Sequence, residues 1–317
     1  MVMSMKVGLI GAGGWGKNLA RTLHELGALG GIAELRLEVR AELKALYPAI
    51  PLYPDYPPLL QSDLPAVAIA TPAATHFSIT KEVLLAGKHV FVEKPLAMST
   101  AEAEELVALA HKAGRILMVG HLLLYQPAIA WIKDSLDSGR LGDLWSLHQE
   151  RLNLGRVRTV ENALWSLGVH DVAVILHLVG GEPEKVDVHG QAVIQPGIED
   201  DIYLHLYFAG GVQAHVHASW LWPEKRRSLT VIGSKGMLVY DEVKGTVALH
   251  RKGVNPDLSL RDEGREVVFE GREEPLRLEL LHFLECLRGR RRPLSDGESA
   301  ISVIRVLETA THKLGSG

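Results

Sequence analysis

Glu93-Lys94-Pro95 places a carboxylate and a lysine directly after a short apolar run, residues 89–92. A lysine in such a position can hydrogen-bond an alcohol oxygen and stabilise the negative charge that develops there, and burial can lower its pKa until it accepts a proton. A glycine-rich loop, residues 11–16, precedes it in the chain. Together the two motifs indicate hydride transfer between a substrate and a bound dinucleotide.

The loop Gly11-Ala12-Gly13-Gly14-Trp15-Gly16 is typical of a dinucleotide site because of what flanks it. Residues 6–10 are predicted to form a buried strand, and Leu19, Ala20, Leu23 and Leu26 recur after the loop at helical spacing. In a strand, turn and helix of this kind Gly11 permits the turn, Gly13 lets the backbone approach a pyrophosphate, and Gly16 allows close packing. We therefore predict that the loop, with Gly14 and Trp15, binds the cofactor; a turn without a ligand is the alternative.

Glu34 follows the second predicted strand, about twenty residues past the loop, where an acidic residue is expected to bind the adenine ribose. A carboxylate there repels the additional phosphate of NADP and favours NAD. Arg36 could pair with that phosphate, so NADP stays possible. An ordinary solvated glutamate at a strand end is the alternative interpretation of Glu34.

The composition excludes several classes of protein. The chain has 317 residues, of which 47% are hydrophobic, enough for two domains with cores of their own. Its formal net charge of −4 gives no general attraction to nucleic acid or to an anionic membrane. A single cysteine, Cys286, excludes an internal disulfide and suits a reducing cytoplasm. With no signal-peptide pattern and no membrane-spanning apolar run, we expect a cytoplasmic protein.

The order of predicted strands and helices divides the chain into two parts. Strands alternate with helices over residues 1–121, which predicts an NAD-binding doubly wound parallel sheet. Residues 122–317 are predicted to form a substrate-binding and oligomerisation domain, because strands there follow one another and predict an open, mostly antiparallel mixed sheet. Its helices are expected at residues 127–138, 167–179, 276–287 and 298–313, and residues 255–265 are expected to be an exposed loop. The fold class is therefore α/β followed by α+β.

A set of motifs resembles the Gfo/Idh/MocA oxidoreductase family: the glycine loop, Ala70-Thr71-Pro72 with Thr75-His76, Glu93-Lys94-Pro95, Val119-Gly120-His121, and Trp165 to Asp171. The resemblance covers most of the chain. It implies a Rossmann domain followed by a domain with an open mixed sheet, NAD or NADP as the hydride carrier, and a homodimer or homotetramer. The segment 165–171 is similar to the branch of the family that acts on nucleotide-linked sugars.

The resemblance also implies roles for two residues. Lys94 follows a strand at the carboxyl edge of the sheet, where ligands of such sheets bind, and the family suggests a cis bond to Pro95. His170 is expected in the first turn of a helix, whose positive end disfavours the imidazolium and keeps the ring ready to accept a proton. Many family members carry an aspartate four residues before this histidine, where this chain has Ser166. Which of Lys94 and His170 deprotonates the substrate stays open.

Further contacts are assigned with the same resemblance in view. Those to the cofactor are Thr71, Pro72, His76, Glu93, Lys94, His121 and Trp165, although a helix cap by Thr75 explains part of that set. Those to the substrate are Asn153, Arg156, Arg158, Ser166 and Asp171, with an arginine meeting a sugar carboxylate or pyrophosphate; solvated surface is the alternative.

A metal site is not expected, although His205, His215 and His217 have spacing that could support one. Residues 212–218 alternate, so the histidines would lie on the polar or oligomeric face of a strand whose other face is core.

The sequence thus predicts an NAD-dependent dehydrogenase that oxidises a secondary hydroxyl of a sugar, with a UDP-linked N-acetylated sugar or uronate as the narrower expectation. The alternatives are a ketoreductase or a polyol or inositol dehydrogenase of the same family, and a non-catalytic dinucleotide-binding regulator. The sugar, the carbon oxidised and the direction of hydride transfer stay open.

Overall fold

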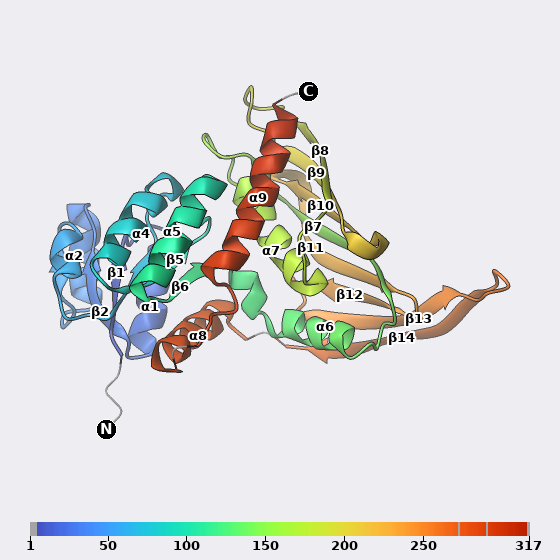
Figure 1. Cartoon of the computed structure of the whole chain (residues 1–317), viewed down its shortest axis with the longest axis horizontal. Coiled ribbons are helices and arrows are strands. Elements are labelled where there is room, and N and C mark those ends of the chain that lie inside the picture. The colour runs from blue at the N-terminus through green and yellow to red at the C-terminus, as the bar shows by residue number, and fades with distance from the viewer. Residues whose placement is uncertain (1–4, 272, 290, 316–317) are drawn as a thin grey trace. The chain divides into compact units, whose positions relative to one another are not determined.

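The computed structural model describes residues 5–271, 273–289 and 291–315 (Figure 1). They form two compact units. The first is Met1–Leu122 with Glu274–Ile304, and the second is Leu123–Glu273 with Arg305–Gly317. The sequence predicted one change of domain, after residue 121, and placed all later residues in the second domain. The structure instead returns residues 274–304 to the first unit.

The first unit contains a six-stranded parallel sheet in the order β3-β2-β1-β4-β5-β6. The order reverses direction between β1 and β4, which is the point where open α/β sheets bind ligands. Each interior strand is an almost wholly buried apolar run, as expected for a sheet covered on both faces. The strands are β1 (Val7–Ile10), β2 (Leu29–Ala33), β3 (Leu52–Tyr53), β4 (Ala66–Ile69), β5 (His89–Glu93) and β6 (Leu117–Gly120).

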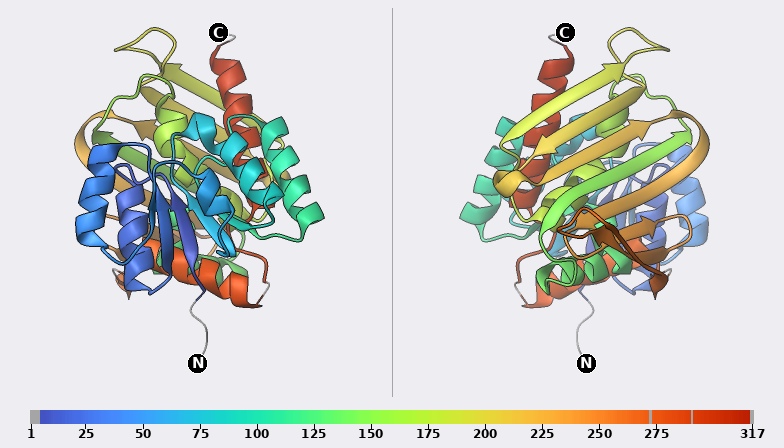
Figure 2. Two further views of the ribbon diagram at one scale, coloured as in Figure 1. Left: turned by 90° about the vertical axis from the view of Figure 1, so that its left-hand side faces the viewer. Right: turned by 90° about the vertical axis from the view of Figure 1, so that its right-hand side faces the viewer.

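Helices cover both faces of this sheet, as Figure 2 shows. Helices α1 (Gly16–Glu25) and α2 (Leu37–Leu46) lie on one face, with α4 (His76–Leu85) and α5 (Thr100–Ala113) on the other. Ser99 caps the start of α5, because its hydroxyl accepts a hydrogen bond from the Glu102 N–H. Short turns of helix, α3 (Pro57–Leu60) and η1 (Ala73–Thr75), complete the connections.

Helix α8 (Pro275–Gly289) was predicted to belong to the second domain. In the structure it belongs to the first unit. It packs beside α1, and Arg21 of α1 forms an ion pair with Glu274. The ring of Phe283 lies 5.7 Å from that of Phe91 on β5. The apolar periodicity of a helix shows which face is buried but not which sheet that face covers. For this reason the sequence did not show to which unit α8 belongs.

The second unit contains an eight-stranded sheet in the order β14-β13-β12-β11-β7-β10-β9-β8. One pair, β10 with β7, is parallel and the other pairs are antiparallel, so the predicted open, mostly antiparallel mixed sheet is confirmed. The strands are β7 (Leu144–Leu154), β8 (Lys185–Gln191), β9 (Asp201–Tyr207), β10 (Gln213–Ser219), β11 (Leu221–Gly233), β12 (Met237–Asp241), β13 (Thr246–Val254) and β14 (Leu260–Glu270).

Helices α6 (Pro127–Asp137) and α7 (Val169–Val179) lie on one face of this sheet (Figure 1). A π-helical turn, η3 (Leu164–Gly168), leads directly into α7. Buried positions alternate with partly exposed ones along β9 and β10, so the sheet's inner face is apolar and its other face carries polar side chains. Helix α9 (Gly297–Leu314) and the turns η2 (Leu122–Tyr125) and η4 (Ala209–Gly211) complete the described elements.

The predicted exposed loop at residues 255–265 is wrong in its second half. Residues 260–265 begin β14, which pairs with β13 as a hairpin closed by residues 255–259. Charged residues fill both faces of this edge strand and pair across the hairpin, as Lys252 does with Asp262, so no apolar alternation marks it in the sequence.

Strand β7 was not predicted. Polar residues at two inward positions, Gln149 and Arg151, break the apolar alternation that identifies a half-buried strand. Among the described residues, no helix has the length and apolar character needed to cross a membrane.

Candidate cofactor site and active site

The glycine loop connects β1 to α1 at the point where the strand order reverses. Gly11 has φ = +85°, and a Cβ there would lie 2.9 Å from the carbonyl oxygen of Ala70, at the end of the neighbouring strand. A Cβ on Gly16 would collide with the Gly11 carbonyl oxygen. Nothing lies within 4 Å of the Cβ position of Gly14, so the loop opens onto space there. The loop thus offers room and backbone N–H groups at a helix start, the surroundings that a pyrophosphate requires.

Glu34 lies directly after β2, and its side chain is 6% exposed. Its carboxylate accepts hydrogen bonds from the Ala12 N–H at 2.9 Å and from the Arg36 backbone N–H at 3.0 Å. It also accepts from the Arg36 guanidinium, at 2.9 Å from Nε and 3.1 Å from Nη2. The Arg36 side chain lowers the pKa of Glu34 to about 2, with the two backbone N–H groups acting in the same direction. Glu34 is therefore an ionised, fixed acceptor at the glycine loop, and its contact with the adenine ribose stays a prediction.

Glu93 and Lys94 stand at the carboxyl end of β5. The Trp15 indole Nε1–H donates a hydrogen bond of 2.6 Å to Glu93 Oε1, which joins the glycine loop to this motif. Burial raises the pKa of Glu93, while the Trp15 N–H and the nearby Lys94 charge oppose the rise. The peptide bond between Lys94 and Pro95 is cis, as the family resemblance implied.

His76 connects the loop after β4 to the Lys94-Pro95 turn. The ring is 1% exposed, with Nδ1 2.7 Å from the Pro95 carbonyl oxygen and Nε2 2.9 Å from that of Thr71. Both oxygens only accept, so each hydrogen bond needs an N–H, and only the charged ring has two. Burial lowers the pKa of His76, against the effect of the two carbonyl groups. Burial therefore favours the neutral ring, whose single N–H donates to one of the two carbonyl oxygens, and His76 lies between Thr71 and Pro95.

His121 follows β6 and is 3% exposed. Neither of its ring nitrogens has a hydrogen-bond partner among the described residues. Burial and, as the smaller cause, the positive charge of Lys94 together lower the pKa of His121 to about 4. The first unit therefore contains a neutral imidazole with open donor and acceptor atoms within the electrostatic reach of Lys94, as the predicted cofactor role allows.

In the second unit, Asp171 anchors the first turn of α7 to strand β7. The Asp171 carboxylate has no solvent exposure and accepts from Arg151 Nε, at 2.7 and 2.9 Å, and from Gln149 Nε2, at 2.9 Å. Burial raises the pKa of Asp171 to about 6, an increase that the Arg151 guanidinium opposes. Arg151 Nη2 also donates to Glu242 at 3.0 Å. Because its carboxylate is used inside the unit, we interpret Asp171 as fixing the helix that carries His170.

The other predicted residues of this unit lie on β7, on η3 or between them. Asn153 accepts from Arg227 Nη2 at 3.0 Å near the end of β7. Arg156 is exposed, and Arg158 forms a 3.5 Å ion pair with Glu161. Trp165, 8% exposed, donates from Nε1 to Thr311 at 2.9 Å, and Ser166 follows it on η3. The indole N–H of Trp165 is therefore already used within its own unit.

Histidines gather on the polar face of the second sheet. His205 Nδ1 lies 2.7 Å from His215 Nδ1, and His217 Nε2 lies 3.0 Å from Asp201 Oδ1. No group of three or more His, Cys, Asp or Glu side chains in the described part of the chain could hold a metal ion.

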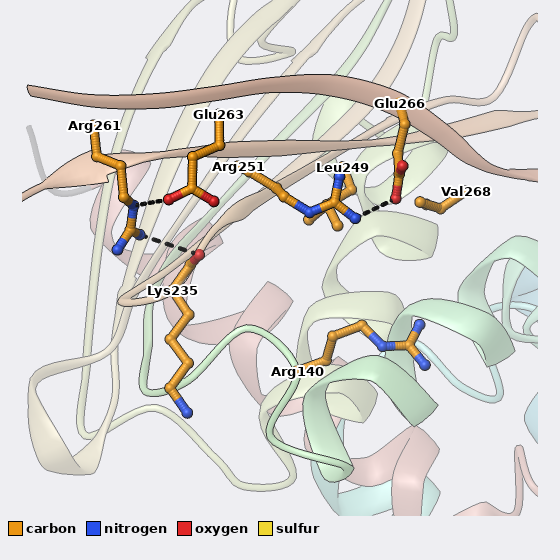
Figure 3. Close-up of a pocket in the computed structure, with 8 residues that line it drawn as sticks. All are labelled: Arg140, Lys235, Leu249, Arg251, Arg261, Glu263, Glu266 and Val268. Atoms are coloured by element: carbon orange, nitrogen blue, oxygen red, sulfur yellow. Dashed lines mark hydrogen bonds and ion pairs between the residues drawn. The ribbon is translucent and has the colours of Figure 1, made fainter.

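A surface pocket of about 440 Å³ lies beside the β13–β14 hairpin (Figure 3). Arg251 forms an ion pair with Glu266, and Arg261 lies 3.7 Å from Glu263, so these cations face carboxylates of the same hairpin. No predicted site residue lines it. We interpret the pair of Arg251 with Glu266 as a cross-strand pair and that of Arg261 with Glu263 as a pair along β14, both at an exposed edge of the sheet.

Sequence reasoning missed the partners that fix the site residues. Gln149, Arg151 and Glu242 were not identified as a buried network, because their positions become neighbours only when the sheet forms. Glu279 was missed as well, although a signal was present: it lies in register with Leu276, Leu280 and Phe283 on the apolar face of α8.

The doubly wound sheet, the glycine loop, the fixed Glu34 carboxylate and the lysine at the end of β5 define an NAD-binding oxidoreductase that acts on CH–OH groups. Residues 5–121 match the oxidoreductase family with an NAD-binding Rossmann fold, and residues 129–239 match the GFO/IDH/MocA C-terminal domain. The chain belongs to the Gfo/Idh/MocA oxidoreductase family.

Several relatives resemble the chain over most of their length. UDP-N-acetylglucosamine 3-dehydrogenase of Acidithiobacillus ferrooxidans is 26% identical over 96% of this chain and 95% of its own, and a solved structure of that enzyme superposes with a TM-score of 0.88 over 98% of both chains. Trans-1,2-dihydrobenzene-1,2-diol dehydrogenase of Oryctolagus cuniculus is 33% identical over 69% of this chain and 68% of its own. The scyllo-inositol 2-dehydrogenase of Bacillus subtilis is 27% identical over 83% and 79%.

Proposed function

We propose that the protein oxidises a secondary hydroxyl group of a nucleotide-linked sugar, a UDP-linked N-acetylated sugar or uronate, with NAD as the hydride acceptor. The observation that carries the proposal is the hydrogen bond from Trp15 to Glu93, because it couples the cofactor loop to the Lys94 motif. The similarity to UDP-N-acetylglucosamine 3-dehydrogenase over nearly the whole of both chains supports the nucleotide-sugar substrate.

The residues take separate roles in this reaction. Lys94 donates a hydrogen bond to the substrate oxygen and stabilises the negative charge that develops as the proton leaves. His170 accepts that proton, a role that the family resemblance assigns to it. Bound NAD supplies the nicotinamide that accepts the hydride. With Ser166 in place of an aspartate, the relay through His170 has one carboxylate fewer than is usual in the family.

Contacts to the substrate follow from exposure and charge. Arg156 is exposed beyond the end of β7 and is available for a carboxylate or a pyrophosphate. Arg158 and Asn153 lie on the same segment, each already with a side-chain partner. Arg156→Ala is therefore expected to raise KM for a charged substrate while kcat stays nearly constant, because the loss affects binding of ground and transition states alike.

The decisive experiment follows NADH absorbance with purified protein, NAD and a panel of UDP-sugars that includes N-acetylated uronates. NADH formation by the wild type is expected, with Lys94→Ala reduced by about 100-fold or more. Lys112→Ala, which removes an exposed lysine of α5, is the matched control and should keep wild-type rates. NADH formed equally fast by Lys94→Ala would remove Lys94 from the mechanism.

A polyol is the second candidate substrate, which the likeness to scyllo-inositol 2-dehydrogenase favours. NADH formation with inositols and not with UDP-sugars would select it. Tight NAD binding without turnover of any alcohol or ketone would instead select the regulator. We further propose a cytoplasmic location, consistent with the buried free thiol of Cys286, and a homodimer or homotetramer, which light scattering would measure.

A further inference from the structure

Helix α8 buries a carboxyl group that the proposed function leaves without a role. Glu279 has no solvent exposure, and neither of its carboxyl oxygens has a hydrogen-bond partner among the described residues. Its neighbours on the same helix face, Leu276, Leu280 and Phe283, are apolar and buried. An ionised carboxylate in such surroundings is far less favourable than a neutral carboxyl group, so Glu279 is expected to hold its proton.

Two periodicities place Glu279 opposite Glu93. Phe283 follows Glu279 by four residues and so lies on the same face of α8. Its ring contacts Phe91 of β5, and the side chains of Phe91 and Glu93 leave the sheet on one face because they are two residues apart. The face of α8 that carries Glu279 therefore covers the side of β5 from which Glu93 extends.

Electrostatics agree with this placement. Burial raises the pKa of Glu279 well above its ordinary value, and the negative charge of Glu93 raises it further. The neighbouring helix α1 presents Arg21, whose guanidinium pairs with Glu25 and with Glu274 before the start of α8. Positive charge from Lys94 acts on Glu93, which also accepts from Trp15.

We propose that Glu279 is a positioning residue, a neutral carboxyl group that lies behind Glu93. Because Glu279 is neutral, the buried pair of Glu279 and Glu93 carries at most one negative charge. Glu93 can then keep its hydrogen bond from the Trp15 N–H, beside Lys94. A second negative charge on α8 would repel Glu93 from this position and loosen its connection to the glycine loop. The effect of Glu279 on function rests on the proposed role of the Lys94 motif, whereas the protonation state of Glu279 is independent of that role. The protonation state and the functional effect are therefore tested by separate experiments.

The first test measures the melting temperature of wild type and Glu279→Gln at about pH 5 and at about pH 8. At about pH 5, close to the ordinary glutamate pKa, ionisation of the unfolded chain has removed only a small part of the stability that the wild type has at lower pH. As the pH rises, the unfolded chain ionises first and wild-type stability falls, whereas glutamine has no proton to lose. The gain from Glu279→Gln should therefore be larger at pH 8 than at pH 5. Equal differences at both pH values would overturn the proposal.

Glu285→Gln is the matched control for that experiment, because Glu285 lies on the same helix and is exposed. Its substitution should give the same small difference at both pH values. A double-mutant cycle with Glu93→Gln adds a test of placement. If the effects of Glu279→Gln and Glu93→Gln on the melting temperature simply add at pH 8, the two carboxyl groups do not interact and the proposal fails.

The second test measures NAD affinity by calorimetry at a series of pH values upward from about 7, so it needs no substrate. Over the pH range in which Glu279 loses its proton, wild-type affinity should weaken by at least about threefold, and Glu279→Gln should retain its affinity, as expected for a residue that acts through another. An identical loss in both proteins would refute the positioning role. Failure of the NADH assay with every sugar, beside a positive result here, would refute only the proposed substrate.

Discussion

Arg36 is predicted to determine how strictly the protein prefers NAD to NADP. Its guanidinium donates two hydrogen bonds to Glu34. A Cβ added to Gly13 would lie 3.5 Å from Arg36 Nη2, so the guanidinium is next to the glycine loop. Its side chain is 51% exposed. An arginine placed there offsets the Glu34 charge and can turn to the additional phosphate of NADP. The wild type should therefore prefer NAD but accept NADP.

Arg36→Ala removes that cation and leaves Glu34 ionised, with the Ala12 N–H and the N–H of residue 36 still bound to it. Solvent screens the contact between the exposed Arg36 guanidinium and a phosphate, which limits how much that contact contributes to binding. NADP binding should therefore weaken by about tenfold at most in Arg36→Ala, while NAD binding changes by less than about threefold.

The assay is calorimetric titration of each dinucleotide into wild type, Arg36→Ala and a control, Arg21→Ala. Arg21 is also a half-exposed arginine in ion pairs with glutamates, but its partners are Glu25 and Glu274, which are not part of the cofactor loop. The control should keep the wild-type ratio of NAD to NADP affinity. An unchanged ratio in Arg36→Ala would refute the reasoning and leave Glu34 alone as the determinant.

Two further predictions concern the surroundings of the site. Gly16→Ala should abolish NAD binding in calorimetry and lower the melting temperature, because its Cβ would collide with the Gly11 carbonyl oxygen; full retention of NAD affinity would contradict the tight turn. Arg151→Met should cost about 3–5 kcal/mol in urea unfolding, more at pH 8 than at pH 5, because it leaves Asp171 buried without its cation and raises the pKa of that carboxyl group further. Arg151→Met combined with Asp171→Leu should recover most of that loss, and no recovery would show that the pair itself stabilises the unit.

The sequence predicted the secondary structure of the first 121 residues well because the signals there are local. A glycine loop between an apolar strand and an amphipathic helix, then strands and helices in alternation, are patterns within about thirty residues of chain. The same holds for Glu34 and Lys94, whose positions follow from the strands that end just before them. The mostly antiparallel sheet of the second unit was also predicted, although its strands β7, β13 and β14 were not, because polar residues occupy positions where apolar alternation was required.

What the sequence by itself determined was therefore the class of fold, the cofactor and the chemical types gathered at the motifs. What only the tertiary structure decided was which groups those motifs meet. Arg36 forms hydrogen bonds with Glu34, Trp15 donates to Glu93, and Arg151 of β7 donates to Asp171 on the helix α7 that packs against the sheet. Glu279 shows the reason most clearly: helical periodicity marked its face as buried, but the strand against which that face packs depended on long-range packing, which no local pattern encodes.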